Sequence, residues 1–365
     1  MVVAARPNFM KAGPVVAALD GRFAVDLVHT GQHYDRKLSG AFLEDLGMPD
    51  PTLNLEIGSG SHAEQTGGVL VAFERYLLDR RPSGVLVVGD VNSTLASALA
   101  AAKLGIPVGH IEAGLRSRDW TMPEEINRVL TDRLSCWLFT PSADAGVNLR
   151  TEGIAEQRIH FVGNVMIDTL LALLPAARDR FASVAKRHGV GATDYGLVTL
   201  HRPATVDVPE ALARALDGVG RVAEHMPFLF PMHPRTTARM ASAGLYLPRG
   251  ITGIDPMGYV DFLAMMDRAS LVITDSGGMQ EETSVLGVPC LTMRPSTERP
   301  ITIEMGTNRL VGNESEDVAA AAVKALALDW RPAQIPLWDG HAATRIAAIL
   351  SEQFDAGVRG AFGLC

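Results

Sequence analysis

The 365-residue sequence is poor in cysteine, carries no excess of positive charge and lacks long apolar runs. Its three cysteines, Cys136, Cys290 and Cys365, show no Cys-x-x-Cys spacing, so neither a disulfide framework nor a zinc site is indicated. The formal net charge of −8 argues against a nucleic-acid partner, which would need a basic face. No apolar run approaches the roughly 20 residues that cross a bilayer, and no secretory signal pattern is present. We therefore expect a cytoplasmic protein with neither a membrane nor a nucleic-acid partner.

Several motifs of nucleotide and hydrolytic enzymes are also missing. The sequence holds no Walker A loop, no Gly-x-Gly-x-x-Gly, no Gly-x-Ser-x-Gly and no cluster of metal ligands. These absences argue against ATP hydrolysis, nicotinamide chemistry and serine hydrolysis. We expect neither a metal nor a cofactor.

Short apolar strands alternate with helical patterns along the chain, which is typical of an α/β fold with parallel sheets. The length fits two domains, which we place at residues 1–164 and 165–349. An amphipathic pattern from about residue 340 to 354 predicts a helix that returns to the first domain, to which we assign residues from about 350 to 365. The predicted first strand, at residues 1–5, is short, which is consistent with a true N-terminus upstream of Met1.

Residues 271–282 have the features of a phosphate site. An apolar strand is followed by Ser276, Gly277 and Gly278, where a helix begins. Free N–H groups and the positive dipole end of a helix attract an anion, and glycines let a ligand approach the backbone. Glu282 lies one and a half turns into this helix, where a carboxylate can accept both hydroxyls of a ribose. The alternative, a side-chain N-cap with glycines for a tight turn, explains less of this spacing, so a nucleoside diphosphate site is favoured.

Carboxylates follow two strands of the first half and begin one of its helices. Asp90 and Glu112 come after two successive apolar strands. Because the carboxyl ends of neighbouring parallel strands meet at one edge of a sheet, we expect these two side chains to lie together, and buried carboxylates need a partner or a ligand there. Glu124 and Glu125 begin a helix, where acids are often only partners of the helix dipole, an interpretation that fits Glu125 well.

Cations and histidines follow other strands. Arg6 and Lys11 lie after the first strand, where both can reach one phosphate; cations at a helix start would otherwise oppose its dipole. His201 and Arg202 end the first strand of the second half, and ligand contact is favoured over a capping role. His233 ends the next strand, where a lone histidine is often only structural.

Together these strings resemble the non-hydrolysing UDP-N-acetylglucosamine 2-epimerase family, from residue 6 to about residue 345. The strings that carry the resemblance are Arg6-Pro7 with Lys11, Gly31-Gln32-His33, Gly89-Asp90-Val91-Asn92-Ser93-Thr94, His110-Ile111-Glu112-Ala113-Gly114-Leu115-Arg116, Pro123-Glu124-Glu125-Ile126-Asn127-Arg128, His201-Arg202, Asp275-Ser276-Gly277-Gly278-Met279-Gln280-Glu281-Glu282 and Thr297-Glu298-Arg299-Pro300. The resemblance implies two Rossmann-like domains facing a central cleft, as in GT-B glycosyltransferases, with the C-terminal helix returning to the first domain.

The resemblance also implies a reaction and a division of roles. UDP is eliminated from UDP-GlcNAc to leave 2-acetamidoglucal, and is then added back with the C2 proton on the opposite face, giving UDP-ManNAc. The implied catalytic residues are Asp90, Glu112, Glu124 and His201. The implied substrate-binding residues are Arg6, Lys11, Arg128, Arg202, His233, Ser276, Gly277, Gly278, Glu282 and Arg299. Which carboxylate serves which face of C2 stays open.

Other functions remain possible at this point. A related enzyme acting on a UDP-diacetamido-uronic acid is the near alternative, and a GT-B glycosyltransferase or a nucleotide-sugar-binding protein belongs to other classes. The family's activator loop reads Gln32-His33-Tyr34-Asp35-Arg36 here, and Pro203 follows Arg202, so a phosphate-binding arginine is lost. We therefore predict an enzyme without activation by UDP-GlcNAc. We also expect a homodimer that supplies ManNAc-type sugars for surface polysaccharide.

Overall fold

The computed structural model describes residues 1–4, 6–31, 47–191, 194–312 and 314–355. The predicted activator loop at residues 32–36 lies outside these ranges. The chain divides into two compact units: unit 1 comprises residues 1–169 and 336–365, and unit 2 comprises residues 170–335.

The division differs from the boundaries drawn on the sequence at 164 and 349. Helix α7 (Val165–Arg187) begins in unit 1, where the Thr169 hydroxyl donates to the carbonyl of Met10. Residues 336–349, assigned on the sequence to the second domain, also belong to unit 1. The Trp338 indole donates to the carbonyl of Pro141 (2.8 Å), and Asp168 accepts the N–H of Ala343 (2.7 Å). Hydrogen bonds, which the apolar pattern does not reveal, thus set these boundaries.

The described residues of unit 1 form seven short parallel strands. They are β1 (Val2–Val3), β2 (Val28–His29), β3 (Leu53–Asn54), β4 (Val85–Val88), β5 (Val108–Ile111), β6 (Trp137–Thr140) and β7 (Ile159–Phe161). One sheet has the order β1-β2-β3 and another the order β4-β5-β6-β7, and β1 lies beside β4. Along the described strands the order is therefore 3-2-1-4-5-6-7, with a reversal between β1 and β4.

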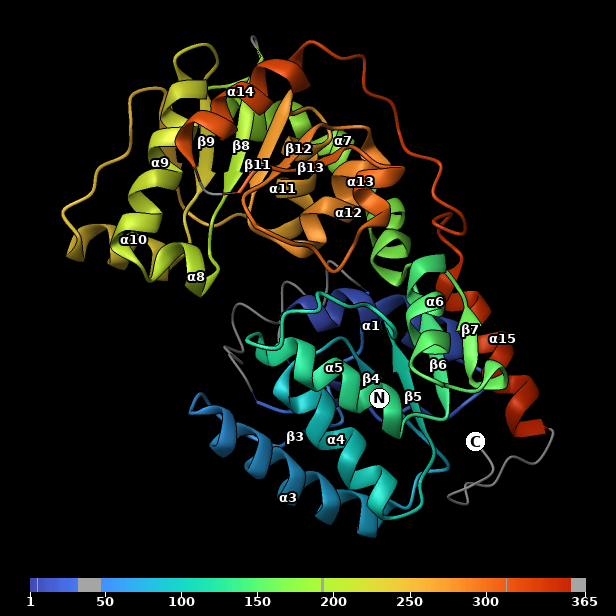
Figure 1. The fold of residues 1–365 in the computed structure, drawn as a ribbon. Coiled ribbons are helices and arrows are strands. Elements are labelled where there is room, and N and C mark those ends of the chain that lie inside the picture. The colour runs from blue at the N-terminus through green and yellow to red at the C-terminus, as the bar shows by residue number, and fades with distance from the viewer. Residues whose placement is uncertain (5, 32–46, 192–193, 313, 356–365) are drawn as a thin grey trace. The chain divides into compact units, whose positions relative to one another are not determined.

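Helices of unit 1 pack against these strands (Figure 1). They are α1 (Arg6–Leu19), α3 (His62–Arg80), α4 (Asn92–Lys103), α5 (Pro123–Leu134), α6 (Ala143–Thr151), the 3-10 turn η1 (Glu156–Arg158) and α15 (Ala342–Asp355). Helix α4 contacts both α3 and α5, and its buried alanines allow this close packing. Helix α15 contacts α1, so the prediction that the C-terminal helix returns to the first domain is confirmed.

Unit 2 is built on one parallel sheet with the order β10-β9-β8-β11-β12-β13. Its strands are β8 (Gly196–Thr199), β9 (Phe228–Pro231), β10 (Ile251–Ile254), β11 (Leu271–Thr274), β12 (Cys290–Thr292) and β13 (Asn308–Leu310). Besides α7, its helices are α8 (Pro203–Val206), α9 (Pro209–Ala223), α10 (Pro234–Ser242), α11 (Tyr259–Met266), α12 (Gly277–Leu286), α13 (Ile301–Glu304) and α14 (Ser315–Leu326).

Both faces of the unit 2 sheet are buried. Val198 and Ile273 pack with α9 and α14 on one face, whereas Leu197 and Val272 pack with α7 and α11 on the other (Figure 1). Because successive residues point to opposite faces, these strands read as continuous apolar runs in the sequence. The prediction of an α/β fold with two Rossmann-like domains is confirmed.

The strand order places one reversal in each unit, between β1 and β4 in unit 1 and between β8 and β11 in unit 2. In open parallel sheets, ligands bind beyond the carboxyl ends of the strands at such a reversal. The reversals therefore indicate two candidate sites. One is formed by the loops after β1, β4 and β5, and the other by the loops after β8 and β11.

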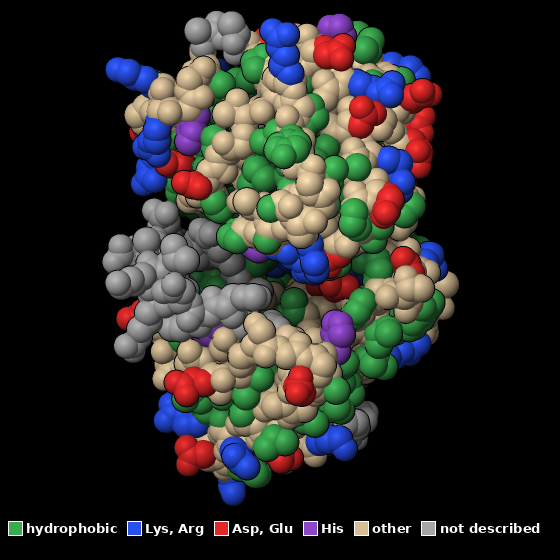
Figure 2. Space-filling view, turned by 90° about the vertical axis from the view of Figure 1, so that its left-hand side faces the viewer, with side chains coloured by type: hydrophobic (Ala, Val, Ile, Leu, Met, Phe, Trp, Pro, Cys, Tyr) green, Lys and Arg blue, Asp and Glu red, His purple; other side chains and the backbone are tan. Residues whose placement is uncertain are grey.

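The described residues can be compared with the sequence for membrane-spanning helices, metal ligands and basic surface. None of their helices is both long and apolar enough to cross a membrane, and they contain no group of three metal-ligand side chains that could hold an ion. On the face shown in Figure 2, basic and acidic side chains are interspersed, with no extended basic surface.

Candidate functional site

In unit 1, the exits of β4 and β5 carry the predicted carboxylates to one place. Gly89 and Glu112 both have left-handed backbone conformations, with φ of 69° and 72°. For glutamate this is an uncommon conformation, which the N–H groups of Glu112 and Ala113 hold by both donating to the carbonyl of Phe139 (3.1 Å each). The positive φ at position 89 favours glycine, and a Cβ there would also lie 3.3 Å from Asn8 Nδ2. Glu112 Oε2 and Lys11 Nζ lie 3.6 and 3.7 Å from the same point, so both side chains line the turn after β4.

Lys11, on α1, forms an ion pair with the buried carboxylate of Glu112. The sequence predicts that Lys11 binds a phosphate, and here its ammonium group already faces a carboxylate. The ion pair fixes the position of the Glu112 carboxylate at the exit of β5. Arg6 begins helix α1, but its side chain lies outside the described part of the chain, so its predicted contact with phosphate stays a prediction.

Asp90 is held from helix α5. Arg128 forms an ion pair with Asp90 and a second with Glu125, whose Oε2 lies 2.6 Å from Arg128 Nη1. Glu125 is buried and also accepts the N–H groups of Ser117 (2.9 Å) and Arg118 (2.8 Å). Arg128 is predicted to bind substrate, but its guanidinium is occupied by two carboxylates, so this structure gives it the task of orienting Asp90. The Asp90 side chain keeps 31% of its surface exposed.

Glu124 is placed differently from the other two predicted acids. It lies in the first turn of α5 with its side chain exposed, and it makes no hydrogen bond or ion pair with the described side chains of Asp90 and Glu112. The structure therefore pairs Asp90 with Arg128 and Glu112 with Lys11. Glu124 lies one helical turn before Asn127 and Arg128, which contact Asp90, and its predicted catalytic role stays a prediction.

In unit 2, the reversal between β8 and β11 is organised by Asp275. Its fully buried carboxylate accepts the backbone N–H groups of His201 (3.0 Å) and Arg202 (2.9 Å), and lies 3.2 Å from His201 Nδ1. The His201 side chain is 50% exposed. The arrangement fixes the loop after β8 and presents the imidazole of His201 outward, as expected for a ligand contact. The role of Asp275 is one that the sequence reasoning missed, although an acid directly after an apolar strand is the signal that identified Asp90.

The predicted phosphate turn begins helix α12. Ser276 occupies the N-cap position in an extended conformation, yet its side chain makes no capping hydrogen bond. The alternative in which the Ser276 hydroxyl caps the helix is therefore not the one seen here. The N–H groups of the first turn, including that of Gly278, point toward the helix start and can donate to an anion.

The sequence explains Gly277 by the close approach of a ligand to the backbone, whereas the structure gives a different reason for glycine at this position. A Cβ there would lie 2.6 Å from Arg299 Nη1 and 2.7 Å from Glu298 Oε1. Arg299 forms ion pairs with Glu298 and with Glu281, the latter at 2.8 Å. Arg299 is predicted to bind substrate, but its buried guanidinium packs against the turn at Gly277, where α12 begins. Glu298 also pairs with Arg294 (2.8 Å) and Arg202 (3.7 Å), a cluster of ion pairs that the sequence reasoning missed.

Glu282 is buried on α12 and accepts the hydroxyl of Tyr259 on α11 (2.6 Å). Burial raises the pKa of Glu282 to about 7; the hydrogen bond from Tyr259 opposes this, and the charge of Glu281 adds to it. The carboxyl therefore changes its charge near neutral pH. Its predicted contact with a ribose stays a prediction. Nothing in the sequence around Tyr259 identifies it as the partner of Glu282.

His233 is exposed and caps helix α10, since its Nδ1 accepts the N–H of Arg235 (3.2 Å). This is the capping role that the sequence allowed for it. Its predicted contact with substrate has no support from this position.

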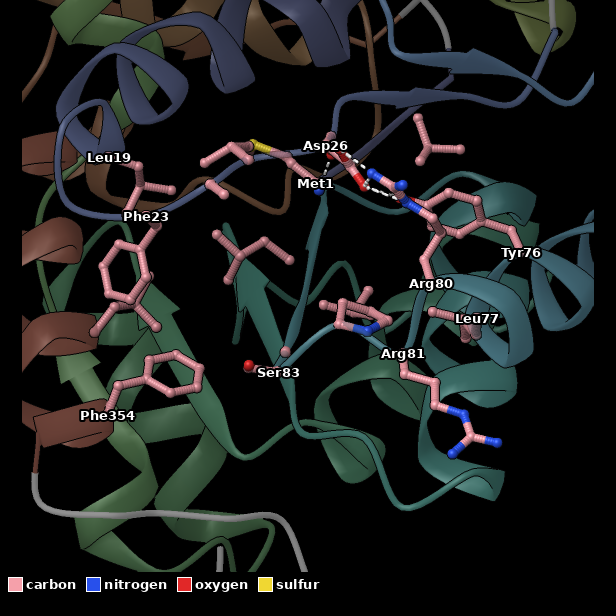
Figure 3. Close-up of a pocket in the computed structure, with 18 of the residues that line it drawn as sticks. Met1, Leu19, Phe23, Asp26, Tyr76, Leu77, Arg80, Arg81, Ser83 and Phe354 are labelled. Carbon is pink, nitrogen blue, oxygen red and sulfur yellow. Dashed lines mark hydrogen bonds and ion pairs between the residues drawn. The ribbon is translucent and has the colours of Figure 1, made fainter.

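A cavity of about 410 Å³ lies elsewhere in unit 1, next to the amino ends of β1, β2 and β4 (Figure 3). Apolar side chains such as Phe23, Leu77 and Phe354 line it, together with the ion pair between Asp26 and Arg80 (3.0 Å). None of the predicted site residues lines it. Parallel strands bind ligands at their carboxyl ends, so we do not assign this cavity to the functional site.

Comparison with known proteins supports the resemblance drawn from the sequence. The family model of UDP-N-acetylglucosamine 2-epimerase matches residues 17–351. The UDP-N-acetylglucosamine 2-epimerase of Methanocaldococcus jannaschii is 42% identical over 360 residues, which cover 96% of this chain and 98% of that protein. A UDP-2,3-diacetamido-2,3-dideoxy-D-glucuronate 2-epimerase of Pseudomonas aeruginosa is 39% identical over 356 residues, covering 96% and 98%.

A solved structure agrees with these sequence matches. The crystal structure of the Methanocaldococcus jannaschii UDP-GlcNAc 2-epimerase in complex with UDP-GlcNAc and UDP matches with a TM-score of 0.89 at 42% identity, over 96% of this chain and 98% of that one. The likeness confirms the predicted GT-B-like fold class. On the strength of the family model and of these relatives, the chain belongs to the UDP-N-acetylglucosamine 2-epimerase family.

Proposed function

We propose that this chain is an isomerase that interconverts UDP-GlcNAc and UDP-ManNAc. The observation that carries the proposal is the pair of carboxylates Asp90 and Glu112, which leave neighbouring parallel strands and each face a cation, in a chain of the 2-epimerase family. An enzyme that inverts a carbon needs one group to remove a proton and another to return it on the opposite face.

The chemistry of C2 explains why UDP must leave. The proton on C2 is not acidic, because no carbonyl group adjoins that carbon. Removing it while the C1–O bond to UDP breaks forms a double bond between C1 and C2, so the negative charge departs with the diphosphate instead of building up on carbon. The reverse step adds a proton to the opposite face of C2, and a phosphate oxygen of UDP bonds again to C1. Atoms and charges balance without a cofactor.

In this proposal Asp90 and Glu112 carry the proton transfers. Each is paired with a cation, Arg128 or Lys11, which orients the carboxylate before substrate binds. The face of C2 that each serves depends on how the sugar binds. Glu124, in the exposed first turn of α5, stays a third candidate for these proton transfers.

Unit 2 is proposed to hold UDP before, during and after its departure. The imidazole of His201 and the N–H groups of the first turn of α12 would donate to the diphosphate, whose charge increases as the C1–O bond breaks. Glu282 would accept hydroxyl groups of the ribose. We propose Asp275 and the ion pairs of Glu298 as the supports of this anchor.

The test is incubation of the purified protein with UDP-GlcNAc alone in deuterated water. Epimerisation predicts a second nucleotide sugar and deuterium at C2 of both sugars, measured by NMR. No exchange at C2 without an added acceptor would contradict the proposal and favour a glycosyltransferase or a binding protein.

A UDP-diacetamido-uronic acid is the second candidate substrate, because the Pseudomonas aeruginosa relative that bears its name is nearly as similar to this chain as the Methanocaldococcus jannaschii protein. Parallel assays with the two sugars separate the candidates. A kcat/KM for UDP-GlcNAc that is below that for the uronic acid would favour the alternative.

Three expectations drawn from the sequence extend the proposal and stay predictions. They are a homodimer, a cytoplasmic location and a supply of ManNAc-type sugars for surface polysaccharide. The absence of activation by UDP-GlcNAc is also still a prediction. It is tested by conversion of UDP-ManNAc without added UDP-GlcNAc, where a lag relieved by a trace of UDP-GlcNAc would contradict it.

A further inference from the structure

A buried histidine joins the two turns that carry Asp90 and Glu112. His110 lies on β5 and is completely buried. Its Nε2 is 2.8 Å from the carbonyl oxygen of Gly89, the residue before Asp90. Its Nδ1 is 2.7 Å from Oδ1 of Asp132, a fully buried residue on α5. One side chain of β5 thus contacts the exit of β4 and the helix that carries Arg128.

The two ring nitrogens of His110 have different partners. The carbonyl of Gly89 can only accept a hydrogen bond, so Nε2 donates to it. Nδ1 contacts the Asp132 carboxyl group, whose pKa burial alone would raise, but which the charges and hydrogen bonds of His110 and Arg116 lower below its ordinary value. His110 is therefore held at both ring nitrogens, which fixes the position and orientation of the imidazole.

Asp132 extends the connection to the turn after β5. Its second oxygen accepts the N–H of Gly114 (3.2 Å) and lies 2.7 Å from Arg116 Nη2. Gly114 is two residues from Glu112. The same helix α5 holds Asp90 through Arg128 and through Asn127, whose amide donates to the Asp90 carbonyl (2.9 Å). The exits of β4 and β5 and helix α5 are therefore linked by one pair of side chains.

We propose that His110 and Asp132 are positioning residues of the epimerase site, which keep the Asp90 and Glu112 carboxylates at the separation that the two proton transfers need. The inference rests on the proposed function. Neither residue contacts substrate in this role; each acts through the backbone of the turns that follow β4 and β5.

The geometry favours this role over a purely stabilising one. A buried ion pair is weak evidence for stability, because removing two charges from water costs about as much as their attraction returns. Hydrophobic residues of similar size would pack between β4, β5 and α5 at no such cost. Hydrophobic residues would not provide the directed hydrogen bonds to Gly89, which precedes Asp90, and to Gly114, which is two residues from Glu112. A misplacement of about 1 Å in such a site can lower a rate about 10²-fold.

The test compares His110→Gln, Asp132→Asn and the double variant with the wild-type protein. Circular dichroism and thermal unfolding check that unit 1 is folded, and UDP binding, measured by calorimetry, counts the molecules whose proposed anchor in unit 2 is intact. We expect kcat per UDP-binding site to fall about 10- to 100-fold in each single variant, with the UDP dissociation constant unchanged within about twofold. The double variant should lose little more than either single variant, because the two residues act as one unit.

A matched control is His160→Gln, since His160 is a partly buried histidine on β7 of the same unit that lies against Phe139 and contacts neither turn. It should keep the wild-type kcat. Wild-type kcat per binding site in both His110→Gln and Asp132→Asn would overturn the proposal, and so would loss of the folded state of unit 1 in both, because the pair would then serve folding itself. A wild-type protein that shows no C2 exchange would refute the proposed function instead.

Discussion

At the scale of single residues, the site depends on how each charged side chain is paired. Asp90 and Glu112 face different cations, Arg128 and Lys11, so each can be neutralised without disturbing the other. Replacing a carboxylate by its amide keeps the shape of the side chain and removes its ability to accept a proton. The change in kcat therefore measures the contribution of the carboxylate to proton transfer, and the change in the UDP dissociation constant measures its contribution to UDP binding.

We predict that Asp90→Asn and Glu112→Gln each lower kcat by about 10²- to 10⁴-fold, the usual loss when a general acid or base is removed. The UDP dissociation constant should stay nearly unchanged, because UDP is assigned to unit 2. Steady-state kinetics and calorimetry measure the two quantities. Glu74→Gln, at an exposed position of α3, is the control. Wild-type turnover in either amide variant would exclude that residue from the proton transfers.

Glu282 gives UDP binding a dependence on pH. Its pKa of about 7 means that the carboxyl is about one-tenth ionised at pH 6 and about nine-tenths ionised at pH 8. Hydrogen bonds from ribose hydroxyls are stronger to a carboxylate than to a neutral carboxyl group. We therefore expect UDP affinity to rise by up to about tenfold over this range. Glu282→Gln should lose this increase and keep only the ionisation of UDP itself. Parallel curves for the two proteins would exclude Glu282 from the ribose contact.

Ionisation of Glu282 also affects the stability of the fold. It favours UDP binding but lowers the free energy of unfolding. Because burial raises the pKa of Glu282 above its unfolded value of 4.5, the folded protein binds this proton more tightly than the unfolded chain. The stabilisation is complete below about pH 4.5 and is lost as pH rises through about 7. Denaturant unfolding in the absence of UDP should therefore show Glu282→Gln gaining stability over the wild type between pH 5 and 8. An equal difference at all pH values would contradict this.

Some of these residues could be predicted from the sequence and others could not. An acid directly after a fully apolar strand identified Asp90 and Glu112, because strand ends in a parallel sheet meet at one edge. The sequence did not reveal that Arg128 and Arg299 are occupied by carboxylates, since ion pairs depend on the approach of distant segments. The partnership of Tyr259 with Glu282 and of His110 with Asp132 has the same cause.

At the scale of elements, each proposed site is formed where strands end and a helix begins or packs close by. In α12 the first residue, Gly277, is in close contact with the Arg299–Glu298 ion pair, so the start of the helix and the ion pair beneath it form one unit. Predicted strands and helices agree well with those observed because their apolar periods are clear. Domain boundaries agreed less well, since single hydrogen bonds of Thr169, Asp168 and Trp338 decide them.

Gly277→Ala tests this dependence of α12 on its support. The added Cβ would meet Arg299 and Glu298 at less than 3 Å, and we expect a loss of about 1–3 kcal/mol of stability, as in other overpacked sites, together with weaker UDP binding. Gly67→Ala in helix α3 is the matched control, because its Cβ would meet nothing within 4 Å. That change should stabilise the protein by about 0.5–1 kcal/mol. Thermal unfolding measures both, and equal effects would contradict the contact argument.

At the scale of the whole molecule, both units repeat one architecture, a row of parallel strands whose spatial order reverses once. The order could not be predicted in detail from the sequence, because strand pairing depends on contacts between segments far apart in the chain. The cavity of unit 1 was likewise not foreseen. It lies off the amino end of β1, which is two residues long, between segments that lead into β2 and β4.

The central claim is that UDP leaves and returns during epimerisation. It is tested most directly with UDP-GlcNAc that carries ¹⁸O in the bridge between C1 of the sugar and the β-phosphorus. Once the C1–O bond is broken, the β-phosphate oxygens become equivalent, so the label should move into nonbridging positions of the β-phosphate as UDP-ManNAc forms, which ³¹P NMR detects. Formation of UDP-ManNAc with the label retained wholly in the bridge would contradict the claim.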